Sequence, residues 1–314
     1  MSNIKSKGNV INYRKSNKIT SQLSLFMLCL PAVICTIIWG YVPLSGLVLA
    51  FKRYNFKDGV FGSAWCGLDN FDVLFKSNDM GRIIRNTVGY ASLNIVLSIV
   101  CGVILALLLF EIKSKMSIKI IQTLAILPRF LSWVVVGFVT YACFEINNGV
   151  FNQIRGFFGA EPLSWYTTPE VWLFIIPFMA IWKKIGIDAI MYYAALMSVD
   201  AEQFEAADLD GASKLQKIWY ISIPSIKGII IILLILSLGS IFRGDFGLFY
   251  QIPRNSGSIY ATTDVIDTYI YRGLKDGSYA MSTAVGLVQS VVGFVCIVAA
   301  NLIVRKVDPE ASLF

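Results

Sequence analysis

Histidine is absent from the 314 residues of the chain, and charged residues make up only 15% of them. Without histidine there is no imidazole for acid–base catalysis, for a proton relay or for a His-ligated metal site. An average soluble domain is about 25% charged, whereas hydrophobic residues reach 56% here and the mean hydropathy is +0.66. The composition excludes a disordered chain and argues against a soluble enzyme.

Paired cysteines and phosphate-binding loops are also missing. The six cysteines contain no CxxC pair and five lie in apolar runs, so we interpret them as small buried side chains and not as a disulfide or zinc framework. No GxxxxGK[ST] segment occurs, so this chain cannot hold ATP phosphates in a P-loop. The net charge of +7 is spread among apolar runs, which leaves no basic face for nucleic acid. The cysteines are Cys29, Cys35, Cys66, Cys101, Cys143 and Cys296.

Long apolar runs dominate what is present. A membrane-spanning helix needs about 20 predominantly apolar residues, and six such stretches predict an all-α integral membrane protein with six transmembrane helices. The first run is too long for a secretory signal, and no cleavage site follows it. We expect a transmembrane domain over residues 23–304, with tails at 1–22 and 305–314. The predicted spans are Leu23–Ala50, Thr87–Phe110, Ile118–Phe144, Val171–Met197, Ile221–Ile241 and Thr283–Val304.

Lysine and arginine set the expected orientation. Five basic residues precede the first span, and three lie in or beside the short loop after the second span. The positive-inside rule therefore predicts that both termini lie in the cytosol. The 51–86 loop, with six basic residues of its own, satisfies the rule less well because it would face outward.

The loop at 198–224 is unusual because it is polar, rich in alanine and helix-favouring. It begins SVDAEQFEAADLDGASKLQKIWY, and its Asp210-Gly211 dipeptide is a turn signal. The pattern predicts two short helices that meet at Gly211. Pro224 is then expected near the start of the next span, where proline is well tolerated.

The same loop carries a motif. Glu205-Ala206-Ala207, Asp210-Gly211-Ala212 and Ile221-Ser222-Ile223-Pro224 resemble in order and spacing the EAA motif of ABC-importer permease subunits. That pattern is E-A-A, three residues, G, nine residues and I-x-L-P. Ile223 replaces its usual leucine, and Ile218 stands where many members have phenylalanine.

The resemblance extends along nearly the whole chain. It points to carbohydrate importers of the maltose-permease superfamily, and within them to the polysaccharide and complex-oligosaccharide branch. The segments that carry it are WCGLDNF at 65–71, RNT at 85–87, ILPRFLSWVVV at 126–136, VIDTYIYRGL at 265–274 and AAN at 299–301.

This resemblance implies a set of partners in the membrane: a second related permease, two cytosolic ATPases that bind ATP and Mg, and an extracytoplasmic sugar-binding lipoprotein. No cofactor is expected on this chain itself. The loop is expected to dock in a cleft of the ATPase, with Glu205 close to its surface and with Phe204 and Leu209 as apolar contacts; the alternative is a merely solvated interfacial loop. The residues implied in coupling are Glu205, Ala206, Ala207, Asp210, Gly211, Ala212 and Pro224.

Charges inside the spans are the best guide to the substrate pathway, because they are expensive in lipid and usually functional or paired. A rise of 1.5 Å per residue puts Lys183 about 24 Å from the inner end of its helix. Relatives of the maltose type contribute sugar contacts at about this position. We therefore expect substrate contacts from Trp182, Lys183, Lys184, Asp188, Arg129, Ser237 and Ser240.

Each of these residues also has a structural interpretation. Lys184 and Asp188 are spaced i, i+4 and can neutralise each other, and Trp182 can be a packing residue. Ser237 and Ser240 can form hydrogen bonds between helices, while Arg129 can serve the carbonyls freed at the Pro128 kink or approach the outer headgroups. If the two lysines face the cavity unpaired, they predict acidic or densely hydroxylated sugars.

The sequence leaves open what two further segments contact, and it leaves three alternative functions. Arg243-Gly244-Asp245-Phe246 and Tyr250 can contact the binding protein or the partner permease. A permease for a non-sugar solute is one alternative, and a secondary carrier that needs no ATPase is another. A membrane enzyme would require the acidic residues of the loop to act as a catalytic cluster: Asp200, Glu202, Glu205, Asp208 and Asp210.

Overall fold

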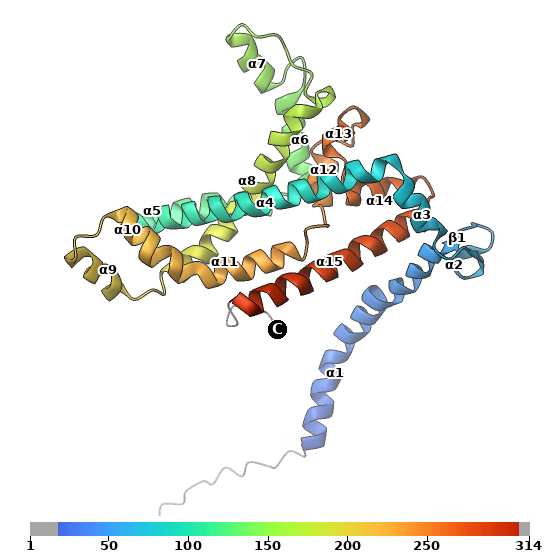
Figure 1. Cartoon of the computed structure of the whole chain (residues 1–314), viewed down its shortest axis with the longest axis horizontal. Coiled ribbons are helices and arrows are strands. Elements are labelled where there is room, and N and C mark those ends of the chain that lie inside the picture. Colours follow the sequence, from blue (N-terminus) through green and yellow to red (C-terminus); the bar gives the residue numbers. More distant parts are fainter. Residues whose placement is uncertain (1–17, 308–314) are drawn as a thin grey trace, which may run out of the picture. The chain divides into compact units, whose positions relative to one another are not determined.

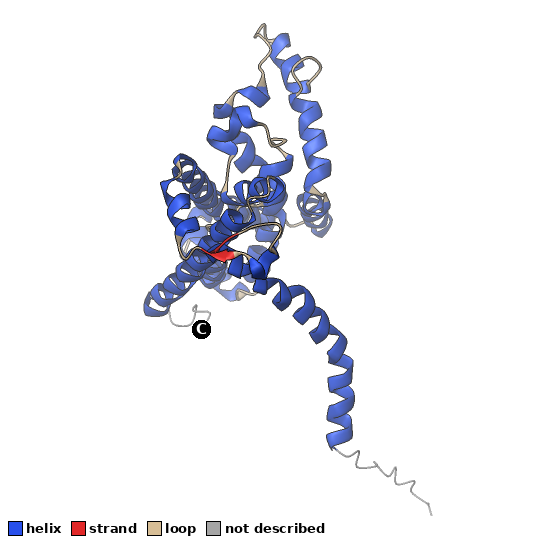
Figure 2. Ribbon diagram, turned by 90° about the vertical axis from the view of Figure 1, so that its right-hand side faces the viewer, coloured by secondary structure: helices blue, strands red, loops and turns tan. Residues whose placement is uncertain are grey.

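The computed structural model describes residues 18–307 and divides the chain into two units, residues 1–48 and 49–314 (Figure 1). Helices make up nearly all of the described chain (Figure 2). Strands occur among these residues in one antiparallel pair, in which β1 (Lys52–Arg53) lies beside β2 (Ala64–Trp65). The predicted all-α fold is therefore confirmed. The tails expected at 1–22 and 305–314 lie mostly outside the described residues.

The first unit contains α1 (Lys18–Thr36), which continues through a π turn at Ile37–Tyr41 into a 3-10 helix at Val42–Phe51. Pro31 lies inside α1, and Pro43 lies at the start of the 3-10 segment. Proline has no N–H to donate and crowds the carbonyl four residues earlier. The change of helix type directly before Pro43 accommodates both effects.

The second unit contains the other helices, and three of them are long. The helix α4 (Asn78–Glu111) packs along α8 (Trp172–Leu196), and α15 (Tyr279–Val307) packs on α11 (Ile223–Leu238) and α14 (Ile266–Lys275). The remaining elements are α2 (Gly59–Gly62), α3 (Asp69–Lys76), α5 (Lys115–Phe130), α6 (Trp133–Phe144), α7 (Val150–Phe157), 3-10 helices at Trp165–Thr167, Pro169–Val171 and Gly257–Ile259, α9 (Ala201–Leu209), α10 (Lys214–Lys217), a π turn at Ile218–Ser222, α12 (Phe246–Gln251) and α13 (Tyr260–Thr263).

In the part of the chain that the structure describes, four uninterrupted helical stretches are long and apolar enough to cross a membrane: Phe26–Phe51, Asn78–Glu111, Lys214–Leu238 and Tyr279–Lys306. The helices α5 and α6 make a fifth span if they are taken together. Helix α8 occupies the fourth predicted stretch, with three charged residues along its length. The structure is therefore compatible with six spans and is that of a multi-pass membrane protein.

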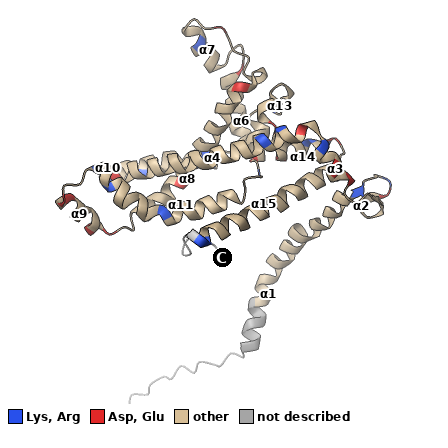
Figure 3. Ribbon diagram, viewed as in Figure 1, with Lys and Arg blue, Asp and Glu red and all other residues tan. Residues whose placement is uncertain are grey.

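Three predicted spans differ from the helices found. The second was expected to begin at Thr87, but α4 begins at Asn78. The third was expected as one helix over Ile118–Phe144, but α5 and α6 are bent by 96° at a break after Phe130. The fifth was expected to begin at Ile221, but its helix starts at Lys214 and runs without interruption to Leu238. Charged side chains gather at α9 and α10 and around α3 and α14, whereas the middle parts of α4, α11 and α15 are almost free of them (Figure 3).

Candidate functional site

A cavity of about 230 Å³ lies where two of the helical paths are broken. One break separates α5 from α6, and the other separates α11 from α12. Walls come from α4 and α8, which are continuous there. In membrane transporters, backbone that leaves the helical path at membrane depth is tolerated where it lines a cavity.

At both breaks, the sequence supplies a residue that begins the next helix. After α5, Leu131 and Ser132 adopt extended backbone angles, and the Ser132 hydroxyl accepts from the backbone N–H of Val135 at 3.3 Å to begin α6. After α11, Asp245 begins α12 in the same way by accepting from the N–H of Leu248 at 3.2 Å. Serine and aspartate are preferred at these positions because they satisfy N–H groups that the helix leaves free.

Lys183 is held at the wall of the cavity. Its Nζ lies 4.0 Å from the centroid of the Trp133 ring, a cation–π contact. The Trp133 Nε1–H donates to Asp245 Oδ2 at 2.8 Å, so this ring ties α6 to α12. A Cβ at Gly247 would come within 2.2 Å of Trp133, which explains why only glycine fits beneath it.

Lys184, one residue further along, has a different environment. Its Nζ lies 3.4 Å from Asp188 Oδ2 and donates to Ser98 Oγ at 3.0 Å, while the Ser98 hydroxyl donates to Asp188. Asp188 is buried, and it does not line the cavity. The i, i+4 neutralisation that the sequence left open is present, and it crosses to α4 through Ser98.

The other predicted pathway residues also divide into residues that line the cavity and residues that do not. Arg129, Ser237 and Ser240 line the cavity, and the Ser240 hydroxyl donates to the Ser237 carbonyl at 2.9 Å. Trp182 does not line it but packs against the hydrophobic cluster around Trp172. Trp182 and Lys183 differ because adjacent residues on a helix point in different directions. The sequence did not show which of the two faces the cavity.

The cavity is rich in positive charge. Arg129, Lys183, Lys184 and Arg243 line it against one lining carboxylate, that of Asp245. Among residues 18–307, no carboxylate lies within ion-pair distance of Arg129, Lys183 or Arg243. Three cations are therefore available to a ligand.

Two residues that line the cavity, Asn94 and Tyr90, were not predicted from the sequence. Asn94 on α4 lines the cavity, and its buried Oδ1 has no hydrogen-bond partner among the described residues. A buried unpaired acceptor is costly unless water or a ligand satisfies it. Tyr90, one turn earlier on α4, also lines the cavity. An asparagine within an apolar span was the available clue to Asn94.

The loop before α11 forms the predicted helical hairpin. Helices α9 and α10 meet at Gly211, whose φ of +75° lies in the left-handed region that side chains with a Cβ rarely adopt. The Ser213 hydroxyl and the Gln216 side chain cap α10 reciprocally. Glu205, Ala206 and Asp210 are exposed, as is Gly211, so one face of the hairpin is free.

Phe204 departs from its expected position. Instead of facing outward, its ring lies 5.4 Å from that of Phe110 at the end of α4 and lines a hollow of about 460 Å³ beneath α9. Leu209, in contrast, is 91% exposed, as an apolar contact for a partner would be. An ion pair of Lys214 with Glu111 at 2.6 Å attaches the hairpin to the end of α4, and one of Lys217 with Asp208 at 2.7 Å joins α10 to α9 within the hairpin.

Pro224 is the second residue of α11, near the helix start as expected, although the helical path already begins before it. The π turn at Ile218–Ser222 immediately precedes it, and the N–H of Ile223 donates to the carbonyl of Ile218. A widened turn of this kind accommodates a proline, which cannot donate to the carbonyl four residues earlier.

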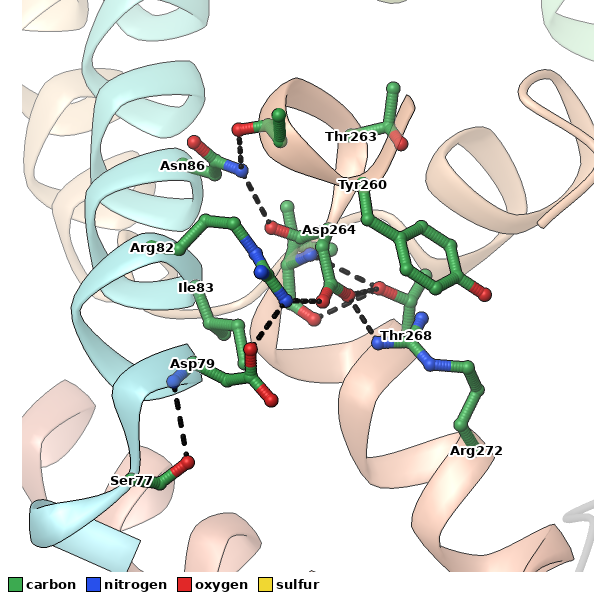
Figure 4. A network of polar contacts seen from close by, with 12 residues as sticks. Ser77, Asp79, Arg82, Ile83, Asn86, Tyr260, Thr263, Asp264, Thr268 and Arg272 are labelled. Atoms are coloured by element: carbon green, nitrogen blue, oxygen red, sulfur yellow. Dashed lines mark hydrogen bonds and ion pairs between the residues drawn. The ribbon is translucent and has the colours of Figure 1, made fainter. Parts of the chain in front are cut away.

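A third polar region was not anticipated at all. Asp264 is fully buried, and its carboxylate accepts from Arg82 at 3.1 Å and from Arg272 at 2.6 Å (Figure 4). Arg82 also pairs with Asp79 at 2.9 Å. The Asn86 amide donates to the backbone carbonyl of Asp264 at 3.0 Å. The cluster ties the start of α4 to α14 across 182 positions of sequence.

Within residues 18–307 no group of three or more cysteine or acidic side chains is arranged to hold a metal ion. The fold, the polar cavity at broken helices and the exposed hairpin together define a membrane permease subunit, a class of protein that moves a solute and is not an enzyme. Comparison with known proteins identifies the family to which it belongs.

A family model described as "Binding-protein-dependent transport system inner membrane component" matches residues 98–310. The chain belongs to this family, as the EAA resemblance predicted. It is 37% identical to Protein LplB of Bacillus subtilis (strain 168) over 91% of this chain and 90% of the relative. It is 34% identical to the polygalacturonan/rhamnogalacturonan transport system permease protein YteP of the same organism, over 93% and 91%.

A solved structure is similar over most of its length. The crystal structure of a bacterial ABC transporter involved in the import of the acidic polysaccharide alginate contains a chain that matches with a TM-score of 0.83 and 34% identity. The match covers 92% of this chain and 98% of that one.

Proposed function

We propose that this chain is a permease subunit of an ATP-driven importer for oligosaccharides that carry carboxylate groups. The observation that carries the substrate class is the cavity with three cations, Arg129, Lys183 and Arg243, that have no carboxylate of residues 18–307 within ion-pair distance. A guanidinium binds a carboxylate in a bidentate manner, and charge-assisted hydrogen bonds are the stronger kind. Two of the similar proteins support the same class by the acidic polysaccharides in their descriptions.

Importers of this kind require partners, and the chain offers surfaces for them. A second permease would complete the pathway, two cytosolic ATPases would bind ATP and Mg, and an extracytoplasmic binding lipoprotein would deliver the sugar. A similar alginate transporter has been solved with its pentasaccharide-bound periplasmic protein. Placing α9 in the cytosol puts both termini there too, in agreement with the basic residues before the first span.

Coupling is assigned to the exposed face of the α9–α10 hairpin, with Glu205 nearest the ATPase and Leu209 as its apolar contact. ATP binding would then favour one of two packings of the bundle, and hydrolysis would restore the other. The left-handed residue Gly211 sets the angle between the two helices. Ala206, Ala207, Asp210, Ala212 and Pro224 belong to the same proposed coupling segment.

The cavity residues have separate proposed roles. Arg129, Lys183 and Arg243 would meet sugar carboxylates, and Asn94 with Ser237 and Ser240 would exchange hydrogen bonds with hydroxyls. Lys184 and Asp188 would set the shape of the wall through their ion pair. Trp182 would support the wall from the hydrophobic cluster behind it.

A substrate panel tests this proposal. The complete importer, reconstituted in vesicles with its binding protein and ATPases, is expected to take up uronic-acid oligosaccharides with ATP hydrolysis and to take up neutral oligosaccharides of equal length poorly. A phosphorylated three-carbon solute is the informative third substrate, because a cationic cavity also suits phosphate and one relative is an sn-glycerol-3-phosphate permease. Preference for that solute or for neutral sugars would contradict the proposal.

Coupling is tested by two substitutions at one position. We expect Gly211→Val to abolish ATP-dependent uptake, because a β-branched side chain is strained at a φ of +75°. We expect Gly211→Asn to keep most of it, because asparagine tolerates this conformation. Binding of the ATPases is measured alongside uptake. Equal behaviour of the two variants would contradict the role given to the turn.

A further inference from the structure

Two further hollows lie along one face of α6. The first, of about 200 Å³, is lined by Val134, Gly137 and Phe138. The second, of about 330 Å³, is lined by Tyr141 and Phe144 with the adjoining Glu145. These positions recur every three or four residues, so they lie on one side of the helix. Trp133, at the start of α6, lines the central cavity.

We call these two hollows the α6 groove; it lies along the same helix whose first residue, Trp133, lines the central cavity. The twelve residues of α6 extend about 18 Å, several times the length of one sugar ring. Figure 1 shows α6 and α7 projecting from the rest of the second unit, away from the hairpin of α9.

Aromatic side chains form the outer hollow. Tyr141 and Tyr166 lie with ring centroids 5.7 Å apart, and Phe144 and Trp165 lie 4.9 Å apart with their rings edge to face. These residues come from α6 and from the segment before α8, so the folded chain brings two aromatic pairs to one place. Aromatic walls with a few polar groups are typical of small-molecule sites, and their apolar faces pack well against the C–H faces of sugar rings.

Arg254 lines both hollows. Its guanidinium carbon lies 4.0 Å from the centroid of Tyr141, and within the described chain it forms no ion pair. Arg254 and Asn255 have φ values of 55° and 50°, which are uncommon for residues other than glycine and concentrate at functional sites. The Tyr260 hydroxyl holds this turn by donating to Asn255 Oδ1 at 2.8 Å.

Glu145 gives the outer hollow an acceptor. The backbone N–H groups of Asn148 and Asn147 donate to its carboxylate and lower the pKa of Glu145, so it is ionised at neutral pH. The hollow therefore offers one cation for a carboxylate, one carboxylate for hydroxyl groups and aromatic faces for sugar rings.

We propose that the α6 groove is a second saccharide-binding site, which holds the following residues of an oligosaccharide whose leading residue occupies the central cavity. In this arrangement Arg254 binds a carboxylate of the chain, and Tyr141 and Trp165 pack against its rings. The inference rests on the proposed function and adds to it a site for chain length.

Chain-length dependence tests the site. Uptake of a uronic-acid disaccharide and of a hexasaccharide is measured with the complete importer in vesicles, for the unaltered chain and for Tyr141→Ala and Arg254→Gln. Each substitution is expected to raise the KM for the hexasaccharide about tenfold, the loss of one contact of about 1.4 kcal/mol, and to leave the disaccharide unchanged. Unchanged disaccharide uptake also shows that the variant is folded.

The matched control is Phe158→Ala, which removes an aromatic ring that is 78% exposed and lines neither hollow. It is expected to leave both substrates unaffected. Equal losses for the two lengths, or no loss for the hexasaccharide, would overturn the second site while leaving the proposed function intact. Failure of the unaltered importer to take up either substrate would instead overturn the proposed function, and the inference with it.

Discussion

The Asp264 cluster and the central cavity both contain arginine, yet they use it in opposite ways. At Asp264, two arginines from distant segments share one fully buried carboxylate (Figure 4). In the cavity, Arg129 and Arg243 have no carboxylate within ion-pair distance among the described residues. Charge that is paired inside the chain serves to hold elements together, whereas charge left unpaired next to a hollow is available to a ligand.

The largest expected effect comes from breaking the paired region. Asp264→Ala leaves Arg272 without its ion partner and Arg82 with Asp79 as its remaining partner, and removing one partner of a buried ion pair costs about 3–5 kcal/mol. We expect a marked loss of thermal stability in detergent or nanodiscs. Asp69→Asn is the control, because its ion pair with Arg53 is exposed at 3.5 Å and is expected to contribute little. Similar stability of the two variants would contradict the structural role of Asp264.

Removing an unpaired cation should have the opposite effect: thermal stability is kept, and substrate uptake is weakened. Lys183→Met keeps the length of the side chain and removes its charge, so we expect thermal stability to be kept or raised, because a buried charge without an ion partner is costly. The KM for an acidic oligosaccharide is expected to rise about tenfold, as for the loss of one charge-assisted contact. Loss of stability without a change in uptake would assign Lys183 to structure.

The smallest effect is expected at Lys184, the cavity lysine that has an ion partner. This residue lines the cavity but pairs with Asp188. Lys184→Met is expected to destabilise the chain by about 1 kcal/mol, because the buried carboxylate loses its counter-charge while that lysine is partly exposed. Adding Asp188→Asn should restore stability. If the double variant is as unstable as the single one, the ion pair is not what holds this wall.

The sequence predicted the elements that depend on local pattern. Apolar runs located the membrane helices, and the Asp210-Gly211 dipeptide with its alanine-rich flanks located the hairpin, because turn and helix preferences act over a few residues. The bend between α5 and α6 was not predicted, since Pro128 inside an apolar run is compatible with a mild kink as well as with a 96° break.

Features that depend on tertiary packing were beyond the sequence. Asp264 and Arg82 lie 182 positions apart, so no spacing rule joins them. Helix α8 is apolar on most sides, so its pattern did not show that Lys183 lines the cavity while Trp182 packs behind it. Phe204 was expected at the free face of the hairpin, but packing against Phe110 draws its ring inward.

The most direct test compares one oligosaccharide in two charge states. Uptake of a uronic-acid oligosaccharide and of its carboxyl-reduced, neutral counterpart is measured with the complete importer, for the unaltered chain and for a variant with Arg129→Gln, Lys183→Met and Arg243→Gln. The account predicts a strong preference for the acidic form in the unaltered importer and loss of that preference in the variant. An unchanged preference in the variant would contradict the claim that the unpaired cations of the cavity recognise the substrate.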